Sequence, residues 1–395
     1  MIRRRSTLLL GTALALTPLL PSGAAAAESS GRGAAERRRD PALQSLVDRV
    51  VAEPNPNPGA FLFARDGLTE RFGAAGVADR ATGRPMTPDL RFRSGSVTKT
   101  FTATVVLQLV AERRVRLDDT VQRLLPDQVR TDNALSGAPI TVRQLLNHTS
   151  GLHDYVEGLL PHFRGLDQYW PREQLIGIGL AHPRYFPAPG TRFRYSNTNY
   201  LLLDLIVERL TDRDLRTNLE DRVFTPVGLR DTSYPLARTT IDGAHVRGYA
   251  DISPLLPDAP DATRCDVTAF SPSEAGASGA LVTTATDIAR FYRALLRGRL
   301  LPAPLLRAML TDTVPATGSA PPVVAYGLGL YVYATDRGPA YGHGGSAPGY
   351  LTFALNSRDG HHQLVAHTNW NSLVDSGIDE DFWAAFQEGY RTRPR

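Results

Sequence analysis

The chain has 395 residues, of which 42% are hydrophobic and 21% are charged, with a formal net charge of +4 and one cysteine. These values exclude a disordered chain, a collagen-like repeat and a scaffold held together by disulfides. Lys99 is the only lysine, and the other basic residues are arginines. A desolvated lysine can lose its proton whereas arginine stays charged, so Lys99 is a candidate for chemistry that arginine cannot perform. Before its neighbours are considered, the alternative is equally strong: the chain has a general bias toward arginine, and one lysine remains by chance.

Residues 1–27 have the pattern of an export signal. Arginines at positions 3–5 precede an apolar run over residues 8–20, and small residues follow at 24–27. The apolar run is too short to span a membrane, and the chain that follows residue 27 has 41 basic and 40 acidic residues. We therefore expect a secreted protein with no membrane anchor, whose balanced charge argues against nucleic acid as a partner.

Strand and helix patterns follow the predicted signal. Residues 28–41 are small and charged and are predicted to be disordered, and residues 42–395 are predicted to form one large two-lobed domain. Near its start, an apolar helical pattern is followed by strand-like runs at 60–64 and 70–77 and by helical spacing over 97–112.

The middle and the end of the domain differ in pattern. Residues 115–275 are rich in helical patterns and in loops with proline and glycine. Strand-like runs return at 326–333, 350–356 and 363–367, before an amphipathic helix over 378–390. Strands at both ends predict an α+β fold, with an antiparallel sheet built from both chain ends, flanked by helices, and a mainly helical lobe inserted at about 115–275. A cleft between the lobes is the expected position of an active site.

Ser96 lies three residues before Lys99, at the start of the predicted helix over 97–112. Residues three apart on a helix share one face, and the positive end of the helix dipole favours negative charge that develops near the serine. A neutral Lys99 could accept the Ser96 proton, because a serine nucleophile needs an adjacent base. The alternative is that Ser96 caps the helix and Lys99 is solvated.

Two further clusters hold residues suited to catalysis. Tyr195 and Asn197 precede a helical run. Tyr195 could relay a proton if cations lowered its pKa, and Asn197 could bind a substrate amide or cap the helix. The segment His343-Gly344-Gly345-Ser346 follows a strand-like run, where glycines permit close approach and a backbone N–H could stabilise an oxyanion. Taken alone, that segment is more typical of a glycine-rich turn.

The three clusters together resemble the serine β-lactamase-like and penicillin-binding hydrolases. This group includes class C β-lactamases, related esterases and soluble extracellular D-alanyl-D-alanine carboxypeptidases. Its motifs are Ser-x-x-Lys, then Tyr-x-Asn, then a triplet that contains Lys or His and ends in Gly. The residues of this chain that resemble the three motifs are, in order, Ser96 with Lys99, Tyr195 with Asn197, and His343-Gly344-Gly345. Further similar segments are residues 92–99, 140–146, 148–152, 195–200 and 326–330.

The resemblance implies that Ser96 forms an acyl-enzyme, which water then hydrolyses. Lys99 and Tyr195 would share the role of base, and the N–H groups of Ser96 and Ser346 would form the oxyanion hole. The residues that it implies for substrate binding are Asn197, His343, Gly344, Gly345 and Ser346. No metal or other cofactor is implied. The expected partner is a small-molecule or peptide substrate, such as a D-Ala-D-Ala peptide, an ester or a β-lactam, and the expected state is a monomer.

Two positions depart from the carboxypeptidase pattern. Members of that group often have threonine in the middle of the third motif and arginine after the Gly-Leu-Gly-Leu segment, and both help to hold the terminal carboxylate of the substrate. This chain has Gly344 and Tyr331 at these positions. The loss of an arginine contact weakens the peptidase interpretation and favours an ester or a modified peptide. Arg337 is near in sequence and is a possible substitute.

The first hypothesis is therefore a secreted serine hydrolase, a D-alanyl-D-alanine carboxypeptidase-like peptidase that β-lactams acylate. The alternatives are an esterase or a class C-like β-lactamase of the same fold and, from a different class, a non-catalytic binding protein. The intact pair Ser96 and Lys99 argues against the binding protein. An α/β-hydrolase is disfavoured because the chain has no Gly-x-Ser-x-Gly elbow.

Overall fold

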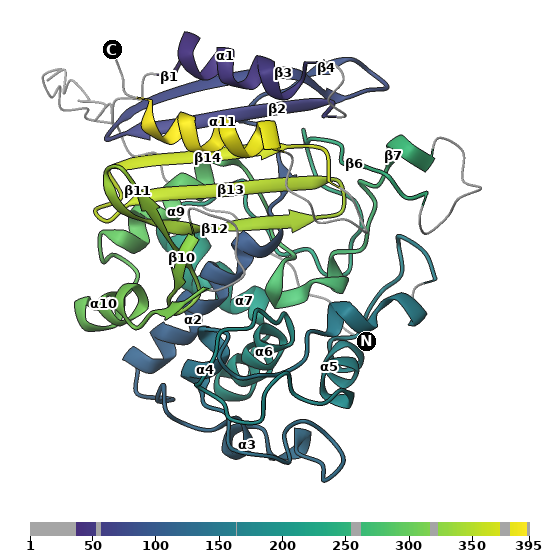
Figure 1. The fold of residues 1–395 in the computed structure, drawn as a ribbon, viewed down its shortest axis with the longest axis vertical. Coiled ribbons are helices and arrows are strands. Elements are labelled where there is room, and N and C mark those ends of the chain that lie inside the picture. Colours follow the sequence, from purple (N-terminus) through teal and green to yellow (C-terminus); the bar gives the residue numbers. More distant parts are fainter. Residues whose placement is uncertain are drawn as a thin grey trace, which may run out of the picture. The chain divides into compact units, whose positions relative to one another are not determined.

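The main sheet takes its strands from both ends of the chain (Figure 1). The computed structural model describes residues 37–52, 57–162, 164–253, 262–316, 323–371 and 380–392. Its sheet strands are β1 (Arg37–Arg39), β2 (Gly59–Asp66), β3 (Thr69–Asp79), β4 (Arg84–Pro85), β9 (Val314–Pro315), β10 (Val323–Tyr326), β11 (Tyr331–Thr335), β12 (Gly338–Ala347), β13 (Tyr350–Ser357) and β14 (His362–Thr368). Their order is β1-β3-β2-β14-β13-β12-β11-β10-β9, with β4 paired to β3.

Antiparallel pairing dominates this sheet, and only β1 and β3 run parallel among the described strands. The N-terminal and C-terminal parts meet where β2 pairs with β14, with Phe63 opposite Val365. The prediction of an α+β fold with an antiparallel sheet built from both chain ends is thus confirmed.

Helices account for most of the remaining structure. The α-helices are α1 (Pro41–Val50), α2 (Thr98–Ala111), α3 (Val121–Leu124), α4 (Val142–Leu146), α5 (Arg172–Ala181), α6 (Thr198–Thr211), α7 (Leu215–Leu219), α8 (Thr225–Val227), α9 (Ala285–Leu296), α10 (Ala303–Thr311) and α11 (Glu380–Arg391). The 3₁₀ turns are η1 (Gly95–Val97), η2 (Pro126–Gln128), η3 (Tyr155–Gly158), η4 (Leu160–His162), η6 (Ala262–Arg264), η7 (Pro272–Glu274) and η8 (Gly276–Ser278), and η5 (Glu220–Phe224) is a π-helical turn.

Helices cover both faces of the sheet, and side chains alternate between the two faces along each strand. On β2, Phe61 and Phe63 belong to a core that also contains Phe101 of α2 and Phe291 of α9. Leu62, between them, belongs to a second core with residues of α1 and α11. The sheet is therefore a central layer, with α1 and α11 on one face and α2 and α9 on the other.

The segments α3 to α8 lie within the stretch 115–275 that was predicted to be mainly helical. Figure 1 shows α3, α4, α5 and α6 grouped away from the main sheet, with α2 between them and the sheet. Two short strand pairs lie beside and within this stretch: β5 (Phe92–Arg93) pairs with β8 (Val282–Thr283), one on each side of it in the sequence, and β6 (Tyr249–Ala250) pairs with β7 (Cys265–Asp266) inside it.

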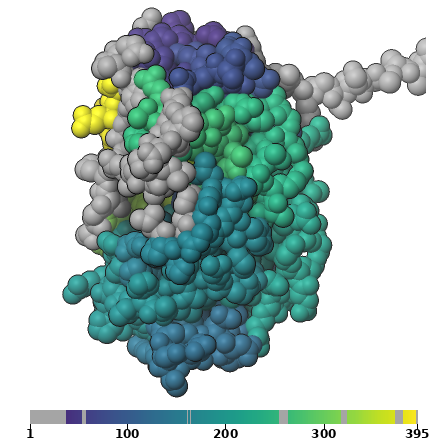
Figure 2. All heavy atoms as spheres, turned by 90° about the vertical axis from the view of Figure 1, so that its right-hand side faces the viewer, coloured from purple at the N-terminus to yellow at the C-terminus, as the bar shows by residue number. Residues whose placement is uncertain are grey.

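In Figure 2, the purple and blue surface of the N-terminal strands and α1 lies at the opposite end from the blue surface around α3. By its internal contacts, Glu36–Arg395 forms one compact unit. Within the described ranges, no helix is long and apolar enough to cross a membrane.

The predicted disordered segment 28–41 ends too late. Arg37–Arg39 form strand β1, and Arg37 donates hydrogen bonds to Glu70 at 2.8 and 3.1 Å. Asp40 then caps α1 by accepting from the N–H groups of Ala42 and Leu43. This part of the prediction is wrong because strand pairing and an ion pair order residues whose composition alone is typical of disorder. The rest of the segment and the predicted signal 1–27 lie outside the described residues.

The predicted strand at 326–333 is two strands joined by a tight turn. β10 ends at Tyr326, the N–H of Gly327 donates to the carbonyl of Leu330 at 2.8 Å, and β11 begins at Tyr331. Gly329 has a φ of +97°, and a Cβ at this position would lie 2.3 Å from the Cβ of Ala103 in α2. Glycine is required there because the turn packs directly on the helix that carries Lys99.

Candidate active site

Ser96 lies in the 3₁₀ turn η1, immediately before α2. Gly95 enters this turn with a φ of +54°, and the Thr98 hydroxyl donates to the Gly95 carbonyl at 2.7 Å. Ser96 is half-buried, and Lys99 follows in the first turn of α2. The sequence-predicted pair therefore lies on consecutive turns, one 3₁₀ and one α-helical.

The Lys99 ammonium is fully buried and has three oxygen neighbours. It lies 3.0 Å from the Ser96 hydroxyl, 2.6 Å from Oδ1 of Asn197 and 2.8 Å from the carbonyl oxygen of Ser278. Burial lowers the pKa of Lys99 to about 7, against the opposing charges of Asp154 and Glu274. A pKa near neutrality makes the neutral amine accessible, and because Lys99 is fully buried, the alternative of a solvated lysine is wrong.

Tyr195 packs beside this pair, with its ring centre 4.8 Å from Nζ of Lys99. Its ring stacks on His148 at 4.2 Å. Burial, together with the neighbouring Tyr331, raises the pKa of Tyr195 well above its usual value, and a hydrogen bond with Ser96 only partly offsets this rise. The condition set for a proton relay by Tyr195, a pKa lowered by nearby cations, is therefore not met in this structure. Tyr195 is a protonated phenol, and Lys99 is the group that can be neutral.

Asn197 joins Lys99 to a carboxylate that the sequence analysis missed. Its Oδ1 accepts from Lys99, and its Nδ2 donates to Oδ2 of Asp154 at 2.9 Å. Asn197 is the N-terminal capping residue of α6, but its side chain makes no capping hydrogen bond. The alternative in which this side chain caps the helix is thus wrong, and the side chain belongs to the site.

His343 lies on β12 and is held as a neutral imidazole. Its Nε2 lies 3.0 Å from the Tyr326 hydroxyl, and its Nδ1 contacts the carbonyl oxygen of Gly344. Burial, with a further contribution from Lys99, lowers the pKa of His343 to about 3. Its influence on Tyr195, whose ring centre is 6.3 Å away, is therefore that of a neutral dipole and not of a positive charge.

The backbone of β12 approaches the serine turn closely. A Cβ on Gly345 would lie 1.9 Å from the carbonyl oxygen of Ser94 and 3.0 Å from the backbone nitrogen of Ser96. A Cβ on Gly95 would lie 2.7 Å from the backbone nitrogen of Ser346. These contacts bring together the two N–H groups that were predicted to form the oxyanion hole.

This part of β12 is also an open sheet edge. Residues 343–347 pair with β13, whereas the pairing with β11 ends at Gly342. The pairs with β13 end at Ala347 and Tyr350, which are joined by two residues. Because hydrogen-bonded and non-bonded pairs alternate in antiparallel strands, the N–H of Ser346 points away from β13, toward the unpaired edge of the sheet.

Aromatic rings lie at both positions that depart from the carboxypeptidase pattern, Gly344 and Tyr331. A Cβ on Gly344 would lie 2.7 Å from the ring of Phe353, so a larger residue requires that ring to move. The Tyr331 ring is parallel to that of Tyr195 at 6.4 Å and lies 4.9 Å from that of His343. Arg337, the possible substitute, donates to the carbonyl oxygen of Arg391 at the end of α11 and is engaged there.

Sequence reasoning missed four residues around Lys99. They are His148, Asp154, Glu274 and Ser278. His148 and Asp154 lie in or just after the segment 148–152 that carried the resemblance, which was the one available signal. The other two lie in η7 and η8, more than 170 residues beyond Lys99, and no local pattern distinguishes them. The described residues contain no group of three or more His, Cys, Asp or Glu side chains that could hold a metal ion.

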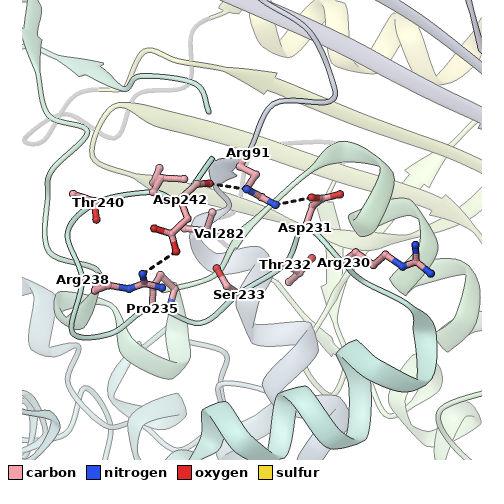
Figure 3. A pocket seen from close by; sticks show the side chains of 11 residues that line it. Arg91, Arg230, Asp231, Thr232, Ser233, Pro235, Arg238, Thr240, Asp242 and Val282 are labelled. Carbon is pink, nitrogen blue, oxygen red and sulfur yellow. Dashed lines mark hydrogen bonds and ion pairs between the residues drawn. The ribbon is translucent and has the colours of Figure 1, made fainter. Parts of the chain in front are cut away.

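A separate surface cavity of about 140 Å³ is lined by none of the predicted site residues (Figure 3). Its charges are largely paired with one another: Arg91 donates to Asp231 and to the backbone oxygen of Asp242, both at 2.7 Å, and Arg238 lies 2.8 Å from the Asp242 carboxylate. This cavity therefore offers little uncompensated charge to a ligand.

The fold and the site together define a serine hydrolase. A half-buried serine is hydrogen bonded to a buried lysine, beside a free sheet edge that brings a second backbone N–H to the serine. The chain belongs to the β-lactamase family, whose model, described as "Beta-lactamase", matches residues 46–387.

Relatives within this family have different names and activities. Penicillin-binding protein 4 of Amycolatopsis lactamdurans is 33% identical over 75% of this chain and 76% of that protein. Esterase EstB of Burkholderia gladioli is 36% identical, and the match spans 49% of this chain and half of the esterase. The crystal structure of a D-stereospecific amidohydrolase from Streptomyces sp. is 37% identical, with a TM-score of 0.74, and the match covers 87% of this chain and 97% of that one. Family membership therefore leaves the substrate open.

Proposed function

We propose that this protein hydrolyses peptide or amide bonds through an acyl-enzyme on Ser96. The observation that carries the proposal is the 3.0 Å hydrogen bond between Ser96 and the buried amine of Lys99. A neutral Lys99 takes the proton from the Ser96 hydroxyl while Oγ attacks the carbonyl carbon of the substrate. The negative charge that develops on the substrate oxygen is stabilised by the N–H groups of Ser96 and Ser346.

The second half of the reaction uses the same groups. Lys99 returns its proton to the leaving amine, directly or through the Tyr195 hydroxyl, and the C–N bond breaks to leave an ester on Ser96. Water then attacks this ester and gives up a proton to the neutral pair. The bond between the acyl carbon and Oγ of Ser96 breaks, the pair returns the proton to Oγ, and the acid is released. Lys99 and Tyr195 act as one proton-transfer pair, so their apparent pKa values in a rate profile belong to the pair.

For the substrate, we propose a D-configured peptide or amide. A D-alanyl-D-alanine carboxypeptidase-like reaction, with acylation by β-lactams, is the form that the motifs predict. Similarity to a penicillin-binding protein and to a D-stereospecific amidohydrolase supports this substrate class. A class C-like β-lactamase and a non-catalytic binding protein have no observation of their own in their favour.

A second candidate is a hydrolase whose substrates have no free carboxylate on the leaving group, such as an amino-acid amide or an ester. It is favoured by the aromatic ring of Tyr331 beside the site and by the engagement of Arg337 with Arg391. Carboxylate recognition is strongest with an arginine in bidentate contact. The similarity to an esterase over about half of each chain agrees with this candidate.

One experiment tests the mechanism. The mature protein is incubated with benzylpenicillin and analysed by mass spectrometry, with a Ser96→Ala variant as control. We expect a covalent adduct on the peptide that contains Ser96 and none in the variant. Equal labelling of the variant would contradict the proposal.

A second experiment separates the substrate candidates. Release of D-alanine from an acyl-D-Ala-D-Ala peptide is compared with cleavage of its C-terminal amide and of a p-nitrophenyl ester of the same acyl group. Preference for the free carboxylate supports the carboxypeptidase form, and preference for the amide or ester supports the second candidate. We also propose that the protein is exported through residues 1–27, which N-terminal sequencing of the protein from culture medium tests.

A further inference from the structure

Asn197 has a polar amide whose two ends are both engaged by charged groups. Its carbonyl oxygen Oδ1 faces the Lys99 amine at 2.6 Å, and its nitrogen Nδ2 faces Oδ2 of Asp154 at 2.9 Å. The reversed amide would place an oxygen against the carboxylate and an NH₂ group against the ammonium. When Lys99 is protonated and Asp154 is ionised, both contacts would then be repulsive, so in that charge state the two groups select one orientation of the amide.

Asp154 is itself held firmly. The residue is 8% exposed, and its Oδ1 accepts from the N–H of Val156 at 3.2 Å as the cap of η3. Its own N–H donates to the Tyr185 hydroxyl at 3.1 Å. The carboxyl group is thus held through Oδ1 and the Asp154 backbone through its N–H, and Oδ2 is left to accept from Asn197.

We propose that Asp154 is a positioning residue, which fixes the Asn197 amide in the orientation that receives Lys99 and thereby holds the lysine against Ser96. Asp154 does not touch the serine. This inference rests on the proposed function, because it assigns Asp154 a part in the proton transfer from Ser96 to Lys99. No motif of the sequence analysis includes this residue.

Several groups set the charge around Lys99. They come from every element packed around the lysine. The residues are Ser96 of η1, His148 after α4, Asp154 before η3, Tyr195 and Asn197 before α6, Tyr200 of α6, Glu274 of η7, Ser278 of η8 and His343 of β12. Of these, Asp154 and Glu274 are carboxyls, and both stabilise the protonated lysine. No hydrogen bond joins the Glu274 side chain to Asn197 among the described residues, so Glu274 is a matched control that has the charge without the positioning contact.

Three single variants separate charge from positioning. Asp154→Asn removes the charge but keeps an oxygen that can accept from Asn197, Asp154→Ala removes both, and Glu274→Gln removes charge only. The rate of acyl transfer from p-nitrophenyl acetate is measured from pH 5 to 9, with the hydrolysis by Ser96→Ala subtracted. All three variants should move the acid limb of the rate profile to lower pH, because Lys99 loses a carboxyl whose ionised form favours its protonation. The shift should be smallest for Glu274→Gln, because burial raises the pKa of Glu274 to about 7 and leaves this carboxyl largely protonated along the acid limb. Only Asp154→Ala should also lose the plateau rate, by about tenfold, because a charged hydrogen-bond partner is missing.

A double-mutant cycle distinguishes positioning of Asn197 by Asp154 from a general structural effect of the Asp154 substitution. If Asp154 acts through Asn197, then Asp154→Ala should change the plateau rate by less than about twofold in an Asn197→Ala background, because coupled residues are not additive. A tenfold loss in both backgrounds would overturn the inference, as would a native plateau rate in Asp154→Ala. Failure of the proposed function is distinguishable from both outcomes, because the native protein would then show no acyl transfer above that of Ser96→Ala.

Discussion

Nζ of Lys99 lies 3.0 Å from Oγ of Ser96, and the lysine side chain has no exposed surface. Lys99→Arg preserves the positive charge but replaces a group that can be neutral by one that cannot. We expect acyl transfer from p-nitrophenyl acetate to fall by about 10²- to 10⁴-fold, the usual contribution of a general base. Circular dichroism and the thermal midpoint show whether the variant folds. A folded Lys99→Arg protein with more than a tenth of native activity would contradict the assignment of Lys99 as base.

The pKa of Lys99 predicts the pH dependence of acylation. Burial lowers this pKa from its usual value to about 7, so the amine is protonated below pH 7 and neutral above it. Because only the neutral amine can accept the Ser96 proton, the rate of acylation should fall about tenfold per pH unit well below pH 7 and level off above pH 8. Stopped-flow measurement of the first turnover provides the profile. An acylation rate that is constant from pH 5 to 9 would contradict this prediction.

The close approach of β12 to the serine turn predicts that Gly345 cannot be replaced. A Cβ at this position would lie 1.9 Å from the carbonyl oxygen of Ser94, which is a backbone atom and cannot move away alone. We expect Gly345→Ala to displace β12 from η1 and to reduce acyl transfer by about 10²-fold, as removal of an oxyanion-hole donor does. Gly177→Ala, in α5 with no atom within 4 Å of the new Cβ, is the matched control and should keep native activity. Native activity in Gly345→Ala would show that the two backbones are farther apart than described.

Tyr331 predicts a change in substrate preference. Tyr331→Arg places a guanidinium beside Tyr195 and His343, where it can contact a carboxylate on the leaving group. We expect the ratio of kcat/KM for an acyl-D-Ala-D-Ala peptide to that for its C-terminal amide to rise by about tenfold, since hydrogen bonds to charged groups are stronger than neutral ones. Tyr331→Phe, which keeps the ring, should leave this ratio within about twofold of the native value. An unchanged ratio in the arginine variant would exclude a role of this position in carboxylate recognition.

A buried arginine predicts how the fold responds to acid. Arg71 has no exposed side-chain surface and donates to Asp40 at 2.6 Å and to Asp66 at 2.8 Å. Burial opposes the ionisation of both carboxyls, but hydrogen bonds outweigh this effect and lower both pKa values. Asp40 accepts from Arg71, and Asp66 accepts from His362 and Arg71. Carboxyls of this kind stabilise the fold above their unfolded pKa, and this contribution is lost as the pH falls through the lower folded pKa.

The free energy of unfolding should therefore decrease between about pH 5 and pH 2. In Asp66→Asn this decrease should be smaller, because one of the two carboxyls no longer titrates. Urea unfolding at several pH values measures it, with Asp48→Asn on the exposed face of α1 as control. An equal loss of stability with acid in the native protein and in Asp66→Asn would show that this cluster does not determine the acid response.

Much of the site could be predicted because its motifs are local. Ser96 and Lys99 are three residues apart, and Tyr195 and Asn197 are two apart, so the members of each pair are close in space because they are close along the chain. The strands at both ends of the chain gave the α+β class, because alternation in the sequence reports a sheet wherever it occurs. The strand at 326–333 was predicted as one element because its apolar pattern is continuous, and the turn at Gly329 depends on packing against Ala103 of α2.

By itself, the sequence predicted which residues form the proposed site and in which order, since a lone lysine three residues after a serine is a local feature. Only the tertiary structure decided the protonation states. It buries Lys99 and so lowers its pKa to about 7, and the surroundings of the half-buried Tyr195 and of the buried His343 favour the neutral form of both. It also brought Asp154 and Glu274 to the lysine and turned Arg337 toward Arg391. Burial and charge at a site are sums over all elements that meet there, and no local segment contains that information.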